Sequence, residues 1–321
     1  MSQSKSLSLS RRSLLIGSCA CLGCMLPGYS FADAPISGRD AAGFHRLMVG
    51  DFEVMVISDG QSAISTSKLL QGSKHRIGRA LKSNFLAEEV STSHNSFLVN
   101  TGSKLVLVDA GAGSLLGPRF GKLSVNLIAA GYRPEQIDEV LLTHLHTDHI
   151  GGLMSGTEPA FANARVRADK RDIDYWLSEA AMRAAPAEAK RFFEASVASL
   201  SAYQKAGKLM AFEGSMELLP GIRSRSAYGH TPGHTMYEVE SKEQKLLLWG
   251  DIVHVAAVQF ADPAVTIGYD ADRAEAEAEH FRVFDEVSKK KLMIGGAHLP
   301  FPGLGHVRQN GKDSYAFVPL S

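Results

Sequence analysis

The chain has 321 residues, 34 acidic against 34 lysine and arginine residues, and an ordinary apolar content, which predicts one large globular domain or two small ones. Because the charges balance, the sequence lacks the basic surplus of a nucleic-acid-binding protein, and we expect no nucleic-acid partner. Beyond the N-terminal segment, no apolar stretch approaches the roughly 20 residues that a membrane-spanning helix needs, so we expect no integral membrane segment in the mature chain.

The N-terminal segment 1–34 resembles a twin-arginine export signal. Arg11 and Arg12 precede an apolar run of small residues that ends at Leu26, and a proline and a glycine then break the predicted helix ahead of an alanine-containing cleavage region. A disordered basic tail is the alternative. The export signal predicts a periplasmic or exported protein whose mature part, 35–321, is a single domain.

All three cysteines lie inside this predicted signal, at Cys19, Cys21 and Cys24. The mature chain would therefore contain no cysteine, which excludes disulfides, thiolate zinc ligands and cysteine nucleophiles. A lipid-attachment site at Cys24 is an alternative fate of the signal, although the leucine that usually stands three positions upstream is missing.

The first part of the mature chain is rich in β-forming residues. Four runs predict two strand pairs, at 44–49 with 52–57 and at 95–100 with 104–109. The intervening residues 61–90 show no clear periodicity, and we expect either a lid or an ordinary surface loop there. A helix is predicted at 123–130, where Gly131 ends it.

The sequence THLHTDHIGG, at 143–152, follows a short aliphatic strand and holds four potential metal ligands. His144 and His146 are two residues apart on an extended chain, so they point to the same side and can bind one metal. Asp148 and His149 lie on the turn into a helix and are directed to a second point nearby. The spacing predicts two adjacent divalent metals, and the ligand types suit zinc, with manganese, iron or cobalt as alternatives.

A dinuclear site needs more ligands than this loop supplies, and further candidates occur where other predicted strands end. They are Asp109, the histidines of the GHTPGH segment, Asp251 and His298. Asp251 is a carboxylate that can bridge two cations. Asp109 is either a support for a ligating imidazole or a simple turn residue.

The THLHTDHIGG run resembles the signature of the metallo-β-lactamase superfamily, and the resemblance covers nearly all of the chain after residue 40. Within the superfamily the chain is most similar to the group of methyl parathion hydrolase and related lactonases and aryl esterases, through the stretches GDFEVMVISDG, NTGSKLVLVDAGAG, GHTPGHT, WGDIVHVAAVQF and AHLPFPGLGH. The resemblance implies an α+β fold, a four-layer αββα sandwich in which helices flank two mixed β-sheets. The related enzymes also suggest a homodimer.

The resemblance implies seven ligands for the two metals. The first metal would be held by His144, His146 and His230, the second by Asp148, His149 and His298, and Asp251 would lie between them. We expect Asp251 and Asp148 to be the catalytic carboxylates. Asp109 and His234 would support these ligands from behind.

The resemblance also suggests the walls of the substrate pocket. The equivalents of Trp176 and Phe193 help to form that pocket in the resembled group, although aromatic residues at this spacing also suit a helix core. His254 and Tyr269 place a polar group and an aromatic ring where parathion-cleaving members have aliphatic residues, and Leu116 replaces an aromatic residue.

Two adjacent divalent cations lower the pKa of a shared water towards neutrality, so we expect a hydrolase that uses a metal-bridging hydroxide. No nucleophile elbow or nucleotide-binding glycine loop indicates a different chemistry. The aromatic and polar pocket residues favour lactones or aryl carboxylic esters as small-molecule substrates, with organophosphate triesters as the alternative. A catalytically silent metal-binding protein is a third hypothesis, which a missing ligand would favour.

Overall fold

A computed structural model describes residues 43–320. The predicted export signal and its three cysteines lie outside the described residues. Within the described part, no helix combines the length and the apolar character needed to cross a membrane.

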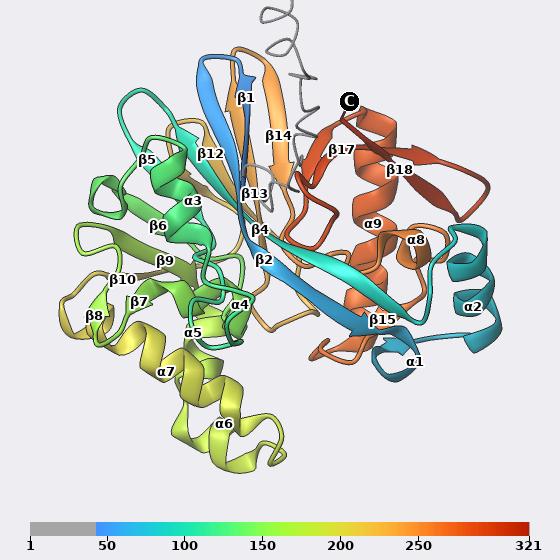
Figure 1. The fold of residues 1–321 in the computed structure, drawn as a ribbon, viewed down its shortest axis with the longest axis horizontal. Helices are drawn as coiled ribbons and strands as arrows, with labels where there is room; N and C mark the ends of the chain where they lie inside the picture. The colour runs from blue at the N-terminus through green and yellow to red at the C-terminus, as the bar shows by residue number, and fades with distance from the viewer. Residues whose placement is uncertain (1–42, 321) are drawn as a thin grey trace, which may run out of the picture. The chain divides into compact units, whose positions relative to one another are not determined.

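Most strands of the described part belong to two seven-stranded sheets (Figure 1). The first has the order β1-β2-β4-β5-β6-β9-β10, with β1 at Phe44–Val49, β2 at Phe52–Ser65, β4 at Glu89–Asn100, β5 at Leu105–Val108, β6 at Glu139–Leu141, β9 at Arg165–Asp169 and β10 at Leu209–Phe212. The second has the order β11-β12-β13-β14-β16-β17-β18, with β11 at Glu217–Leu219, β12 at Ile222–Ser226, β13 at Thr235–Ser241, β14 at Gln244–Leu248, β16 at Met293–Gly295, β17 at Leu304–Gln309 and β18 at Tyr315–Pro319. Both sheets are mixed, because β5, β6, β9 and β10 run parallel in the first and β14 and β16 run parallel in the second.

The remaining described elements are helices and two short strand pairs. The pairs are β3 (Leu70–Gln71) with β15 (Thr266–Ile267) and β7 (Met154–Ser155) with β8 (Glu158–Pro159). The α-helices are α1 (Thr66–Leu69), α2 (Lys74–Ser83), α3 (Leu123–Ala129), α4 (Thr147–Ile150), α5 (Lys170–Trp176), α6 (Glu179–Ala184), α7 (Lys190–Lys205), α8 (Ala256–Gln259) and α9 (Arg273–Lys290). Two short 3₁₀ turns occur at Pro134–Gln136 and Gly151–Leu153.

Among residues 43–320, three of the four apolar clusters lie between the four layers of the fold. The two sheets face each other across the middle core, where Phe97 of the first sheet and Val239 of the second are buried together. The outer face of the first sheet packs against α3 and α7 through residues such as Leu127 and Leu200. The outer face of the second sheet packs against α9, and Figure 1 shows these helices on opposite sides of the sheets. The predicted αββα sandwich is confirmed.

The local sequence explains the edges of this sandwich. Val49 pairs with Phe52, so Gly50 and Asp51 form the predicted hairpin turn, and Gly50 has the positive φ of 58° that favours glycine. Helix α9 begins after Asp272, whose side chain accepts hydrogen bonds from two backbone N–H groups of the first turn.

The expected lid or loop at 61–90 is wrong. Strand β2 continues to Ser65 and stays paired with β4 as far as Glu89, and α1, β3 and α2 occupy the intervening part. A bulge between Ser58 and Gly60 shifts the register in the middle of β2. The bulge breaks the period-two alternation of apolar residues, which hides the second half of the strand from sequence inspection.

The parallel strand pairs place several polar residues at one edge of the sandwich. Strands β5 and β6 run in the same direction, so Asp109 and the loop after Leu141 emerge side by side. In the second sheet β14 and β16 also run in the same direction, so Asp251 and His298 follow neighbouring strand ends. Candidate ligands from both sheets therefore meet where the sheets end.

Candidate metal centre

The loop after β6 places its histidines through a change of backbone direction. His146 is extended, with φ −74° and ψ 155°, and is the last residue before α4. The rings of His144 and His146 lie edge to face with their centroids 4.6 Å apart. Helix α4 then turns Asp148 and His149 towards a second point, as the spacing predicts.

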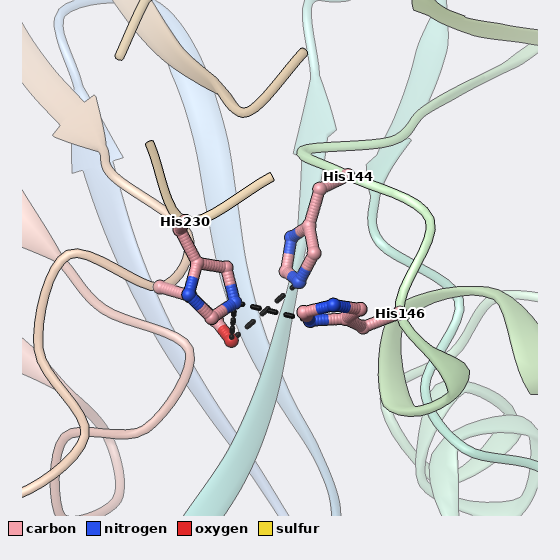
Figure 2. A group of neighbouring side chains, drawn as sticks. His144, His146 and His230 are labelled. Carbon is pink, nitrogen blue, oxygen red and sulfur yellow. Dashed lines mark hydrogen bonds and ion pairs between the residues drawn. The ribbon is translucent and has the colours of Figure 1, made fainter. Parts of the chain in front are cut away.

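Three imidazoles and one carboxylate form the first group of candidate ligands. Figure 2 shows His144, His146 and His230 converging on one point. Nε2 of His230 lies 3.0 Å from Nδ1 of His146 and 3.3 Å from Oδ2 of Asp251. Nε2 of His144 lies 3.6 Å from the same carboxylate oxygen.

The second group shares Asp251 with the first. Nε2 of His149 lies 3.2 Å from Oδ1 of Asp251 and 3.5 Å from Oδ2 of Asp148. Nε2 of His298 lies 3.0 Å from Oδ2 of Asp251 and 3.4 Å from Oδ2 of Asp148. In each group the ligand atoms all lie within 4.8 Å of one another.

The geometry of both groups fits a divalent cation. Tetrahedral zinc with bonds of about 2.0–2.1 Å to nitrogen and oxygen separates neighbouring ligand atoms by about 3.3 Å. The distances within the two groups scatter around that value. Nε2 of His144, Nε2 of His149 and Oδ1 of Asp251 are buried without a hydrogen-bond partner, an arrangement that is costly unless a cation satisfies these atoms. All seven expected ligands are therefore brought together.

Asp109 supports the second group from behind. Its Oδ2 accepts hydrogen bonds from Nδ1 of His149 and from the Thr143 hydroxyl, both at 2.8 Å, and its Oδ1 accepts one from the Thr143 backbone N–H. The Thr143 hydroxyl in turn lies 3.0 Å from Nδ1 of His144. Asp109 thus orients His149 directly and His144 through Thr143.

His234 and His230 have different hydrogen-bond partners. His234 donates from Nδ1 to the carbonyl of Ala227, and its Nε2 accepts a hydrogen bond from the backbone N–H of Asp251. It therefore holds the backbone of a candidate ligand. His230 donates from Nδ1 to Oδ1 of Asp270 at 2.7 Å, which leaves Nε2 facing the first group.

Burial and neighbouring charges shift the pKa values of these histidines in opposite directions. Burial, followed by the charge of His149, lowers the pKa of His144 well below its ordinary value, and burial likewise lowers the pKa of His234 to about 3. Burial also opposes the charge on His230, but its hydrogen bonds to Asp251 and Asp270 raise its pKa to about 9. The carboxylates therefore stabilise the protonated, positively charged form of His230. A divalent cation can replace the proton.

The family model of the "Metallo-beta-lactamase superfamily" matches residues 91–298, about two-thirds of the chain. The chain belongs to this superfamily.

Individual members of the superfamily resemble the chain to different extents. The solved structure of the hydrolase AbOPH in the beta lactamase superfamily is 32% identical, with a TM-score of 0.84 over 88% of this chain and 99% of that one. AidC, a dizinc quorum-quenching lactonase solved with a product, is 28% identical, with a TM-score of 0.80 over the same shares. The N-acyl homoserine lactonase of Bacillus cereus is 25% identical over 52% of this chain, and the match spans only 58% of that relative.

The residues expected in the substrate pocket of this superfamily member occupy different environments. Trp176 lies beside the metal centre, with its ring 5.4 Å from that of His146. Phe193 is only 1% exposed and packs behind Trp176 in the core, so it does not line a pocket. The adjacent Phe192 is instead the ring near His146, at 5.7 Å.

The other three expected pocket residues lie on the side of the second sheet or in an exposed loop. Nε2 of His254 lies 3.1 Å from Oδ2 of Asp251, and its ring stacks on that of His298 at 4.7 Å. Tyr269 is partly exposed, with its ring 6.3 Å from that of His254. Leu116 is exposed in the loop between β5 and α3.

Sequence reasoning missed three residues that the fold brings to this centre. Asp270 holds His230, and His94 of β4 lies 3.1 Å from Oδ2 of Asp148 through its Nδ1. Asp172 of α5 accepts hydrogen bonds from the backbone N–H groups of Leu145 and Gly233. A carboxylate ahead of a helix was the signal for Asp270, whereas His94, within a strand, gave none.

Proposed function

We propose that the chain is a metal-dependent hydrolase that binds two zinc ions and cleaves lactones or aryl carboxylic esters. The observation that carries the proposal is the position of Asp251, whose carboxylate belongs to both groups of candidate ligands. A carboxylate shared between two such groups can hold two cations a few ångströms apart, as dinuclear hydrolytic sites require.

The carboxylates of the site would have two roles, to balance the charge of the metals and to orient the ligating histidines. When bound, two divalent cations supply a water of lowered pKa and polarise the oxygen of a substrate carbonyl. Asp251 and Asp148 balance the positive charge at the second group, where both lie within 3.5 Å of Nε2 of His149. Asp109 and Asp270 hold His149 and His230 in the tautomers that turn Nε2 towards the centre.

The surroundings of the centre favour a flat or acyl substrate. The half-buried ring of Phe192 lies on the His146 side, where it offers apolar surface to an aryl group or an acyl chain, and the buried ring of Trp176 lies next to it. On the other side, Nδ1 of His254 is buried without a hydrogen-bond partner, so it can hydrogen-bond a polar group of the substrate. The likeness to N-acyl homoserine lactonase and to the lactonase AidC also supports a lactone substrate.

A substrate panel tests the proposal. The purified chain, loaded with zinc, manganese or cobalt, would be assayed with dihydrocoumarin, aryl acetates, acyl-homoserine lactones and methyl paraoxon. We expect kcat/KM for the lactones or aryl esters to exceed that for the phosphotriester. A preference for methyl paraoxon would instead support the phosphotriesterase alternative, and no turnover of any substrate would contradict hydrolase activity.

Two variants connect turnover to the shared carboxylate. Asp251→Asn and His298→Ala should each lower kcat/KM at least 100-fold, because each removes a ligand of the second group. Asp285→Asn, on the outer part of α9, is the control and should retain wild-type turnover. Undiminished turnover in both site variants would refute the assignment of the second metal.

A further inference from the structure

His94 lies in β4 beside the metal centre but belongs to neither group of candidate ligands. The residue is 7% exposed, and its side chain lies between Asp148 and Ser62. Nδ1 is 3.1 Å from Oδ2 of Asp148, and Nε2 is 2.9 Å from the Ser62 hydroxyl oxygen. The ring is also held edge to face by Phe120 and His298, at 4.9 and 4.7 Å.

The register of β2 and β4 explains why these groups meet. His94 pairs with Gly60, just after the β2 bulge, and Ser62 pairs with Thr92. Ser62 is therefore the diagonal neighbour of His94 on the same face of the sheet, close enough for a side-chain hydrogen bond. Gly60 has no side chain that could cover the His94 ring from the partner strand.

One arrangement of protons suits the contacts among His94, Asp148 and Ser62. A carboxylate cannot donate a proton, so the 3.1 Å ion-pair contact between Nδ1 of His94 and Oδ2 of Asp148 favours the tautomer with the proton on Nδ1, an atom that is buried and has no aligned hydrogen-bond partner. The other ring nitrogen, Nε2, then accepts the proton that the Ser62 hydroxyl donates. Ser62 thereby fixes the His94 tautomer that can bind Asp148.

Within the second group of candidate ligands, Asp148 needs such a support more than His149 and His298 do. It lies on α4, a helix of four residues, and its side chain is 17% exposed. By contrast, His149 is held by Asp109, and His298 donates from Nδ1 to the carbonyl of Ser93. The Asp148 oxygen that meets His94 is the same Oδ2 that faces Nε2 of His149 and His298.

We propose that His94, with Ser62 behind it, is a positioning residue that holds the Asp148 carboxylate in place for the second metal. The inference rests on the proposed dinuclear site and adds a specific consequence to it. Loss of the contact between His94 and Asp148 should weaken binding of the second cation and leave binding of the first unchanged, because the first group does not contain Asp148.

Two amide substitutions separate the roles of the two ring nitrogens. His94→Asn can place an N–H donor near the position of Nδ1, whereas His94→Gln places one near the position of Nε2. The metal-free protein would be titrated with zinc against a chromophoric chelator, which reports the affinity of each equivalent without any substrate. We expect His94→Gln to weaken the second equivalent about 10- to 100-fold, and His94→Asn to recover most of that loss.

Further variants control for general damage to the fold. Ser62→Ala should weaken the second equivalent less than His94→Gln does, since it removes only the group that fixes the tautomer. His280→Gln changes another buried histidine, on α9, whose Nδ1 donates to the carbonyl of Pro263, and it should leave both equivalents unchanged.

The outcomes distinguish this inference from the proposed function. The positioning role is overturned if His94→Gln keeps wild-type affinity for both equivalents, if it weakens both equally, or if the asparagine and glutamine variants behave alike. Wild-type protein that binds fewer than two equivalents would contradict the dinuclear site itself.

Discussion

His149, His230 and His298 each use one ring nitrogen for a hydrogen bond that faces away from the centre, to Asp109, Asp270 and a backbone carbonyl respectively. Each bond fixes the proton on Nδ1, so the lone pair of Nε2 points to the candidate metal. An imidazole without such a bond would lose rotational entropy when it binds a metal, and it would also have to adopt the correct tautomer. These outer partners therefore contribute to metal affinity although they touch no metal.

Asp270 and Asp109 provide a matched test of this idea. Asp270→Asn should weaken the first zinc equivalent about 10- to 100-fold, because Asp270 orients His230 of the first group. Asp109→Asn should weaken chiefly the second equivalent, since Asp109 binds Nδ1 of His149 directly and reaches His144 of the first group only through Thr143. Both affinities would be measured by competition with a chelator. An identical pattern of loss in the two variants would contradict the separate assignments.

The ligands were predictable because each candidate is a histidine or aspartate in a short glycine-bounded motif at a strand end. Their supports were less accessible to sequence reasoning. Asp270 and His230 are forty positions apart, and only the packing of the loop before α9 joins them. His94 gave no signal at all, because a polar residue within a strand is ordinarily an exposed position of the alternation.

At the scale of elements, α7 decides which of two adjacent phenylalanines meets the metal centre. A helix turns by about 100° per residue, so neighbouring side chains face different directions. The ring of Phe192 lies 5.7 Å from that of His146, whereas Phe193 packs into the core against Trp176. The sequence places both on one apolar helix and does not give the rotation of that helix against the sheet.

The two phenylalanines should therefore respond differently to truncation. Phe192→Ala should raise KM for aryl or acyl substrates about tenfold, equivalent to ~1.4 kcal/mol of lost apolar contact, with little change in stability. Phe193→Ala should lower the free energy of unfolding by about 3–5 kcal/mol, because it opens a cavity in the core. Steady-state kinetics and urea unfolding measure the two effects separately. If Phe193→Ala changed KM and Phe192→Ala changed stability, this orientation of α7 would be contradicted.

Asp172 joins two elements that carry ligands. From α5 it accepts hydrogen bonds from the Leu145 backbone N–H, in the loop after β6, and from Thr231 and Gly233, in the loop after β12. Burial raises the pKa of Asp172 from 3.8 to about 6, although these hydrogen bonds favour the charged form. The folded protein therefore retains this proton at a pH where the unfolded chain has released it.

The sign of the resulting pH dependence follows from linkage. Between about pH 4 and pH 6 the folded state binds more protons at Asp172 than the unfolded state, so this group lowers stability as pH rises through that window. The change is on the order of 3 kcal/mol for a shift of about two pKa units. Asp172→Asn should remove this part of the slope in urea unfolding of the metal-free protein, whereas Asp174→Asn, an exposed neighbour on α5, should not. Parallel pH profiles for wild type and Asp172→Asn would contradict the argument.

For the whole molecule, the candidate ligands come from both sheets and span positions 144 to 298. The αββα layering was predictable from the resemblance carried by a few motifs, whereas the second half of β2 was not, because the bulge at Gly60 interrupts its alternation. The same layering makes the centre a link between the two sheets. Cations bound there would hold together elements that otherwise meet mainly through the middle apolar core.

Removal of the metals should therefore lower the thermal stability of the entire fold. A ligand at 1,000 times its Kd stabilises the native state by about 4 kcal/mol, which for a chain of this size corresponds to a fall in Tm of roughly 10 °C when a chelator removes it. Calorimetry with and without chelator measures the shift. Asp251→Asn should show a smaller shift, because a carboxylate common to both groups is lost. Equal Tm values for the zinc-loaded and chelated wild-type protein would contradict a metal link between the sheets.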